Sequence, residues 1–233
     1  MTSRNILVLV EGAKTDVRLV KKLLRIYDLD STFEIISYNT NIYTLYNKMF
    51  KHRDIETLDL LQTLKEYDKS GSDIFNKKYS DILLIFDLDP HDPLFEFEKI
   101  IEMTEYFNES TDNGKLYLNY PMVESFSHRY DEDDIEFMDR TVNINDLMNY
   151  KEIVNSFIGD PNKLGKTKDN MSKIILQNLE KANNIIQTTD FTYYPEFSKI
   201  LDVQLDKIAL DNELFVLCTC IFFIADYDKN LLH

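Results

Sequence analysis

Four acidic residues stand at or just beyond the ends of short apolar runs in the first half of the chain. Glu11 follows "ILVLV", Asp87 and Asp89 follow "ILLIF", and Glu124 comes shortly after "KLYLNY". Open α/β sheets gather their ligands at the carboxyl ends of parallel strands, which meet at one edge. If the runs are neighbouring strands, these carboxylates converge there, and clustered carboxylates need a cation. Carboxylate oxygens suit Mg²⁺ (or Mn²⁺), and we expect metal ligation by Glu11, Asp87 and Asp89.

A divalent cation in such a site polarises a phosphoryl oxygen and aligns the attacking or leaving oxygen of a phosphodiester. The alternative for each acid alone is structural. Glu11 and Gly12 also fit an ordinary turn, because glycine bends the backbone at little cost. The other three acids fit helix caps or turn positions. All four at strand ends favour the metal site.

The elements that would position these acids alternate along the first half of the chain. Strands are expected at residues 6–10, 33–38, 81–89 and 115–120, and helices at 15–27, 41–50, 55–67, 93–107 and 121–130. This alternation predicts an α/β domain with a mainly parallel sheet flanked by helices. From about Asn143 strand signals fade, and residues 144–159, 170–186 and 211–225 are predicted to be helical. We therefore expect a domain at 1–140 and a C-terminal helical lobe at 141–233.

The net charge of −15 over 233 residues excludes a general attraction to nucleic acid or anionic lipid. A nucleic-acid substrate then requires a local patch, bound metal ions or a partner. The best local candidate is the segment "NKLGKTKDNMSK", with Lys163, Lys166, Lys168 and Lys173. A solvated surface is the interpretation favoured for this segment, as it is for the acidic stretch at 130–139.

The apolar run at 214–225 is too short to span a bilayer and predicts a buried helix. It contains Cys218 and Cys220, which would point in different directions on a helix. We interpret them as core thiols, in agreement with a reducing compartment. No apolar signal segment stands between Met1 and the first predicted strand, so a cytoplasmic protein without membrane association is expected.

The motifs "VEGAKTD" and "FDLDPHD" resemble the TOPRIM domain of topoisomerases, primases, ribosomal-RNA maturases and OLD-family nucleases. That fold carries Glu-Gly after its first strand and Asp-x-Asp after a later one. Many members place a second acid four residues after the glutamate, whereas Asp16 here is five residues after. This spacing is similar to the RloB-like branch found in bacterial phage-defence loci.

The same branch carries a segment to which "NYPMVESFSH" is similar, with Asn119, Pro121, Glu124 and His128. The resemblance covers about residues 5–130. It implies metal ligation by Glu11, Asp87 and Asp89, catalytic roles for these acids with Glu124 and His128, and substrate contacts by Gly12, Lys14 and Asn119. Arg18 also lies close to the predicted cleft.

Two histidines are candidates for proton transfer. His128 stands four residues after Glu124, which on a helix puts both on one face, and imidazole titrates near neutrality. His91 lies two residues beyond Asp89 and fits a general base, a metal ligand or a turn residue bonded to backbone. These alternatives stay open.

The leading hypothesis is a Mg²⁺-dependent nuclease that cleaves RNA or DNA in anti-phage defence. The alternative is a non-catalytic effector or sensor subunit that works through a partner protein such as an ATPase, because the chain has no ATPase motif of its own. A receiver-like phosphotransfer domain also clusters acids at strand ends, but it carries paired acids after its first strand. A homo-oligomer is left open.

Overall fold

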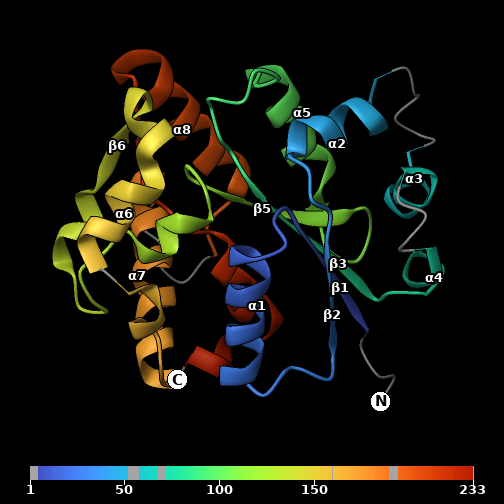
Figure 1. Cartoon of the computed structure of the whole chain (residues 1–233), viewed down its shortest axis with the longest axis horizontal. Helices are drawn as coiled ribbons and strands as arrows, with labels where there is room; N and C mark the ends of the chain where they lie inside the picture. Colours follow the sequence, from blue (N-terminus) through green and yellow to red (C-terminus); the bar gives the residue numbers. More distant parts are fainter. Residues whose placement is uncertain (1–4, 52–57, 68–71, 159, 189–193, 233) are drawn as a thin grey trace.

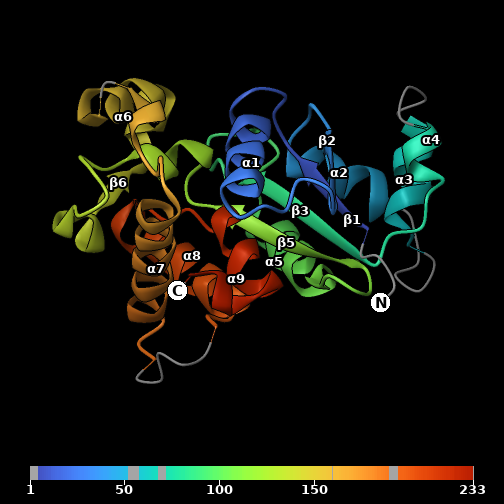
Figure 2. The same ribbon diagram turned by 90° about the horizontal axis from the view of Figure 1, so that it is seen from below.

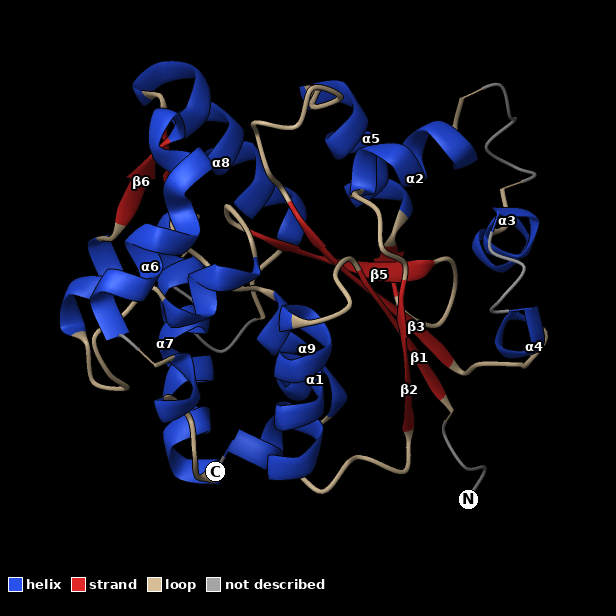
Figure 3. Ribbon diagram, in the orientation of Figure 1, coloured by secondary structure: helices blue, strands red, loops and turns tan. Residues whose placement is uncertain are grey.

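The computed structural model describes the chain except residues 1–4, 52–57, 68–71, 159, 189–193 and 233. Its main sheet has the order β2-β1-β3-β5-β4. The strands are β1 (Ile6–Val10), β2 (Phe33–Ser37), β3 (Asp81–Asp87), β4 (Asn108–Glu109) and β5 (Gly114–Asn119). All pairs are parallel except that of β4 with β5. The predicted α/β class, a mainly parallel sheet flanked by helices, is confirmed (Figure 3).

The central strands explain why the sequence predicted them. β1 is buried along its whole length, and the interior of β3 is buried as well. Strands covered on both faces appear in a sequence as continuous apolar runs. The two-residue strand β4 lies at the sheet edge, is exposed and carries no such run, and it was not predicted.

Four described helices in the first half of the chain lie where they were predicted, and a fifth, the four-residue α4, was not predicted. They are α1 (Thr15–Ile26), α2 (Ile42–Met49), α3 (Leu60–Tyr67), α4 (Ser72–Phe75) and α5 (Phe97–Tyr106). The start predicted for the third helix, at residue 55, lies outside the described residues. The α5 helix begins later than the predicted residue 93, because a turn comes first, in which Asp92 Oδ1 accepts the N–H of Leu94 at 2.7 Å.

The helix predicted at 121–130 is wrong. This segment follows a cis peptide bond between Tyr120 and Pro121 and forms the short 3₁₀-helix η3 (Val123–Ser127). A 3₁₀-helix has about three residues per turn, so residues four apart no longer share a face. The expected alignment of Glu124 with His128 therefore fails.

The C-terminal part is not entirely helical, which corrects the prediction. Strands β6 (Thr141–Asn143) and β7 (Glu213–Phe215) pair antiparallel. The helices there are α6 (Tyr150–Ile158), α7 (Lys168–Ile185), α8 (Phe197–Asp211) and α9 (Phe223–Tyr227), and short 3₁₀-helices are η4 (Ile135–Asp139), η5 (Ile144–Asn149), η6 (Pro161–Lys163), η7 (Cys220–Phe222) and η8 (Lys229–Leu232).

The single helix predicted over 211–225 is wrong for an identifiable reason. The α8 helix ends at Asn212, whose φ of 57° is left-handed, and the chain then turns into β7. The buried amide of Gln204 accepts the N–H of Phe215 and donates to its carbonyl, both at 2.9 Å. Residue Leu217 then forms a bridge to Tyr120. Extended backbone here finds its hydrogen bonds in distant parts of the chain.

Contacts join the two predicted domains. Thr219 donates from Oγ1 to the carbonyl of Leu118 in β5 at 2.8 Å, and Tyr27 of α1 bonds Ser172 of α7 at 3.0 Å. In Figures 1 and 2, α1 lies between the sheet and the C-terminal helices α6 and α7. The element that follows the first acidic residue is therefore also the element on which the C-terminal part packs.

Cys218 and Cys220 are both free and buried, as predicted for core thiols. Their sulfur atoms lie 3.4 Å apart, because the segment before η7 is not helical; the expectation that they point apart is wrong. Among the described helices, none combines the length and apolar character required to cross a membrane.

Candidate carboxylate site at the sheet edge

Glu11 links the first strand to the third. Its N–H donates to the carbonyl of Ile85 at 3.0 Å, so its backbone continues the pairing of β1 with β3. Its Oε2 accepts the N–H of Asp87 at 3.1 Å. The side chain of Glu11 is thereby held across the end of β3, beside the first aspartate of the Asp-x-Asp pair.

Asp87 is held from the opposite side by the fourth parallel strand. It lies opposite Asn119 in the register of β3 with β5, and the Asn119 amide donates to Asp87 Oδ1 at 3.1 Å. Asn119 is fully buried, and its own oxygen accepts the N–H of Cys220 at 3.1 Å. The structure thus makes Asn119 a positioning residue for Asp87, whereas the resemblance implied a substrate contact.

Asp16 belongs to the same cluster, although it was not among the predicted site residues. It is 5% exposed in the first turn of α1. A Cβ at Gly12 would lie 2.5 Å from Asp16 Oδ2, so glycine is needed there to admit this carboxylate. The acid five residues after Glu11 was the sequence signal for Asp16.

Glu124 approaches the cluster from η3 and meets a cation from α6. Lys151 Nζ lies 3.3 Å from Glu124 Oε1, and this charge raises the pKa of Lys151. The sequence offered no signal for Lys151, which is far from the acids along the chain. Its approach means that the C-terminal part contributes a charged group to this edge.

Asp89 lies in the turn after β3 with a φ of 34°, a region that aspartate enters more readily than most residues. Its N–H donates to the carbonyl of Pro121 at 3.1 Å, and its Oδ1 accepts the N–H of His91 at 3.3 Å. Burial raises the pKa of Asp89. His91 is exposed, as is Lys14 at the residue preceding α1.

Burial and mutual repulsion disfavour negative charge in this cluster. Burial, reinforced by the charges of Asp16 and Asp89, raises the pKa of Glu11 to about 7. Burial also raises the pKa of Asp16 to about 6, with Glu124 as the main charged contributor. The pKa of Asp87 rises well above its ordinary value, first through burial and then through Glu11. Such a group of perturbed acids is typical of functional sites.

The residues fit a divalent cation in chemistry but do not form a complete protein cage. Within the described ranges, no group of three or more His, Cys, Asp or Glu side chains is arranged to hold a metal. However, Asp16 Oδ1 and Glu124 Oε2 are buried oxygens without a hydrogen-bond partner in the structure. Magnesium commonly uses one or two carboxylates and completes its shell with water and substrate phosphate. Two carboxylates of this edge therefore suffice for such a site.

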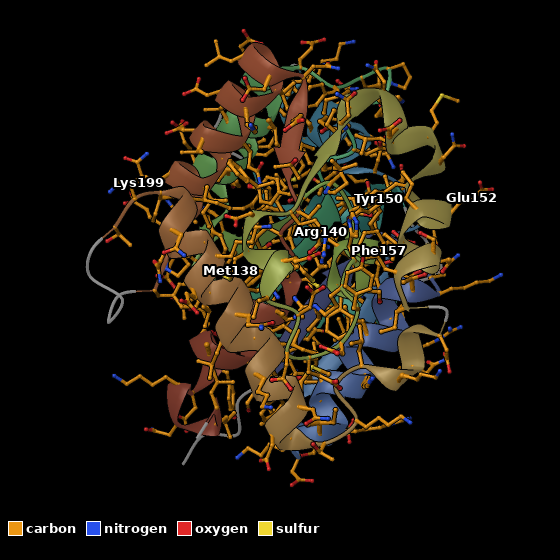
Figure 4. The ribbon with its side chains drawn as sticks, turned by 90° about the vertical axis from the view of Figure 1, so that its left-hand side faces the viewer. Met138, Arg140, Tyr150, Glu152, Phe157 and Lys199 are labelled. Carbon is orange, nitrogen blue, oxygen red and sulfur yellow. The ribbon has the colours of Figure 1, made fainter. Side chains whose placement is uncertain are left out.

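His128 lies apart from the carboxylates. It is 3% exposed, its Nδ1 lies 3.0 Å from the hydroxyl of Tyr150, and its ring packs on Phe157. The guanidinium of Arg140 donates to the His128 carbonyl at 2.9 Å and lies over the Phe157 ring. Figure 4 shows Arg140, Tyr150 and Phe157 on this side of the molecule, where α6 packs.

Burial, with Arg140 and Lys181 nearby, lowers the pKa of His128 to about 4. Folding thus favours the neutral ring. The unfolded chain binds more protons than the folded chain between pH 6.5 and 4, so His128 makes stability fall as pH falls through that window. The loss amounts to about 3 kcal/mol.

We therefore expect His128→Gln to flatten the pH dependence of stability below pH 6.5. Urea unfolding at several pH values between about 4 and 7.5 measures this. Parallel profiles for the two proteins would contradict the assignment of His128 to the packed interior.

A cavity of about 240 Å³ opens beside Glu124, between α1, η3 and α6. Glu124 and Lys151 line one part of it, and Arg18 and Lys22 of α1 line another. A phosphate group placed here would meet cations on one side and the acidic edge on the other. The arrangement suits a phosphate ester whose scissile bond is handled at that edge.

The chain matches no family model, and neither a curated protein nor a solved structure matches it.

Proposed function

We propose that the protein is a Mg²⁺-dependent (or Mn²⁺-dependent) nuclease of TOPRIM type that hydrolyses phosphodiester bonds. The supporting observation is the cluster of Glu11, Asp16 and Asp87 at the carboxyl edge of the sheet, with pKa values raised by burial and mutual charge. A buried acidic cluster of this kind is costly to the fold, and a bound cation would offset that cost. A role in cytoplasmic anti-phage defence is part of the proposal.

Within this proposal the residues have separate tasks. Glu11 and Asp87 would hold the cation, Asn119 fixes Asp87, and Asp16 lies close enough to influence both. The cation, when bound, supplies Lewis-acid polarisation of a phosphoryl oxygen. Without a cation, burial raises the pKa of Glu11 to about 7; as an alternative to binding the cation, Glu11 would accept a proton from water near neutrality. Lys151 forms an ion pair with Glu124, and it would also contact a substrate phosphate.

A second candidate function is a non-catalytic effector or sensor subunit acting through a partner such as an ATPase. The observation that favours it is the incomplete ligand set among the described residues, together with the net charge of −15. In that function the edge would bind a cation or nucleotide without turnover.

A cleavage assay distinguishes the nuclease from the non-catalytic subunit. The purified chain is incubated with tRNA, single-stranded RNA, plasmid DNA and linear DNA. Each substrate is run with Mg²⁺, with Mn²⁺ and with EDTA. Cleavage that requires the metal is the expected result and identifies the substrate class. Absence of cleavage for every substrate contradicts the nuclease proposal for the isolated chain and favours the partner-dependent function.

A further inference from the structure

The outward face of α1 carries a row of cations. Arg18, Lys21, Lys22 and Arg25 are spaced by three, one and three residues in the sequence, a pattern that places them on one side of a helix. Opposite them the segment before α7 contributes Lys166. These cations and Ile26 line a surface hollow of about 390 Å³, and no acidic residue of the described chain is part of its lining. In a chain with a net charge of −15, a hollow with five cations among its six described lining residues is unusual.

Most of these cations are exposed and form no ion pair within the described chain. Arg18, Lys21, Arg25 and Lys166 are exposed, and none makes an ion pair with another residue of the described chain. The carboxylates of Glu132 and Asp160 lie close enough to act electrostatically on Lys22, and Glu132 also accepts the N–H of Gly165 at 2.9 Å. Neither carboxylate forms an ion pair with the four exposed cations within the described chain. The positive charge of the hollow is therefore available to an outside partner.

Lys22 differs from its neighbours because it builds the hollow. Its ammonium donates to the carbonyl of Leu164, which fastens the segment carrying Lys166 against α1. Burial lowers the pKa of Lys22, with Lys166 contributing in the same direction. The fold thus brings two cationic segments together that are far apart in the sequence.

The hollow continues toward the carboxylates. Arg18 and Lys22 also line the cavity that contains Glu124 and Lys151, so the two spaces adjoin along α1. From Arg18 to Arg25 the helix rises about 10 Å, which corresponds to the rise of about three nucleotides of one strand measured along the axis of a duplex. A polyanion lying on the outer hollow would reach Glu124, the carboxylate of the site that lines the inner cavity.

We propose that the cationic track of Arg18, Lys21, Arg25 and Lys166 binds the sugar-phosphate backbone of a nucleic acid and leads it to the carboxylate site. The track would give the proposed nuclease a binding surface for its substrate. That the bound strand is then cleaved rests on the proposed function. Repeated phosphates are the partner because the track gathers several exposed cations, without partner carboxylates in the described chain, along one face of α1 and the facing segment. Among the residues that the structure describes, its lining contains no aromatic side chain on which a base would stack, so the binding is expected to be independent of sequence.

The test uses the full chain and measures binding alone. Fluorescence anisotropy with labelled single-stranded RNA, single-stranded DNA and duplex DNA is recorded in EDTA, between about 50 and 200 mM salt. The track variant is Lys21→Gln/Arg25→Gln/Lys166→Gln, which spares Lys22. The matched control is Lys51→Gln/Lys65→Gln/Lys78→Gln, near α2, α3 and α4 on the side away from α1 in Figures 1 and 2. Each triple removes three positive charges, so both take the net charge from −15 to −18.

The track variant is expected to bind at least about tenfold more weakly at the lowest salt, and its slope of log K against log salt should fall by about 2 to 3. The control should bind as the unmodified chain does. Equal weakening in both variants, or no binding of any nucleic acid by the unmodified chain, overturns the proposal. Binding lost in the track variant without any metal-dependent cleavage by the unmodified chain upholds the track and rejects the nuclease. Cleavage and binding both unaffected in the track variant reject the track and leave the nuclease standing.

Discussion

Replacing Asp87 by asparagine is expected to lower metal-dependent phosphodiester cleavage by at least about a hundredfold, the size of effect seen when one preorganised electrostatic group is removed. The amide keeps the shape of the carboxylate, and its oxygen can still accept the 3.1 Å hydrogen bond from Asn119. What is lost is a carboxylate beside Glu11 that would bind the cation and fix its position. The measurement is the initial cleavage rate at saturating Mg²⁺.

The matched control for this variant lies on the same strand. Asp81 begins β3, at the edge opposite to the cluster, where it accepts the hydroxyl of Ser110 at 3.0 Å. Asp81→Asn is expected to cleave at the rate of the unmodified chain. A rate for Asp87→Asn within a fewfold of the unmodified chain would show that the cluster does not carry the chemistry.

The second large effect is on stability: Glu11→Gln is expected to stabilise the fold, whereas most substitutions of buried residues destabilise it. In EDTA at pH 8, Glu11→Gln is expected to raise the free energy of unfolding by about 3 kcal/mol. The physical cause is burial next to Asp16 and Asp89, which raises the pKa of Glu11 from 4.5 to about 7. Glutamine avoids the buried charge while its oxygen can still accept the N–H of Asp87.

The pH window follows from that shift. Between pH 4.5 and 7 the folded chain binds more protons at Glu11 than the unfolded chain, so stability falls as pH rises through this window. The advantage of Glu11→Gln should therefore be small near pH 4.5 and full above pH 7. Urea unfolding of both proteins near pH 4.5 and at pH 8 measures the difference between their free energies of unfolding. His128 is present in both proteins, so its opposite pH trend cancels in that difference.

Glu34 provides a control with the reverse sign. Its carboxylate pairs with Lys77 at 2.8 Å, and this hydrogen bond lowers its pKa. Glu34→Gln is expected to lower the free energy of unfolding by at most about 1 kcal/mol at pH 8, because the pair is partly exposed to solvent.

Adding Mg²⁺ should raise the unfolding midpoint of the unmodified chain more than that of Glu11→Gln. A destabilised Glu11→Gln at pH 8 would contradict the repulsive cluster.

The sequence by itself determined the fold class and the placement of three acids. The strands at 6–10 and 81–87 are covered on both faces, and their uninterrupted apolar runs identify them without knowledge of their neighbours. Once parallel strands were predicted, geometry required Glu11, Asp87 and Asp89 to lie at one edge, where the structure has them. The TOPRIM resemblance and the metal-dependent activity stay predictions.

The tertiary structure alone decided how the site is completed. Lys151 had no sequence signal, and the contact of Asn119 with Asp87 and the position of the segment at 163–168 against α1 depend on residues far away in the sequence. No local pattern records such contacts. The apolar run at 214–225 shows the same limit. A stretch that is buried on all sides has no periodicity to separate strand from helix, and here hydrogen bonds to Gln204 and Tyr120 made its first part extended. For His128, a 3₁₀ turn in place of an α-helix moved the ring into the interior, because a small change in helical pitch redirects every later side chain.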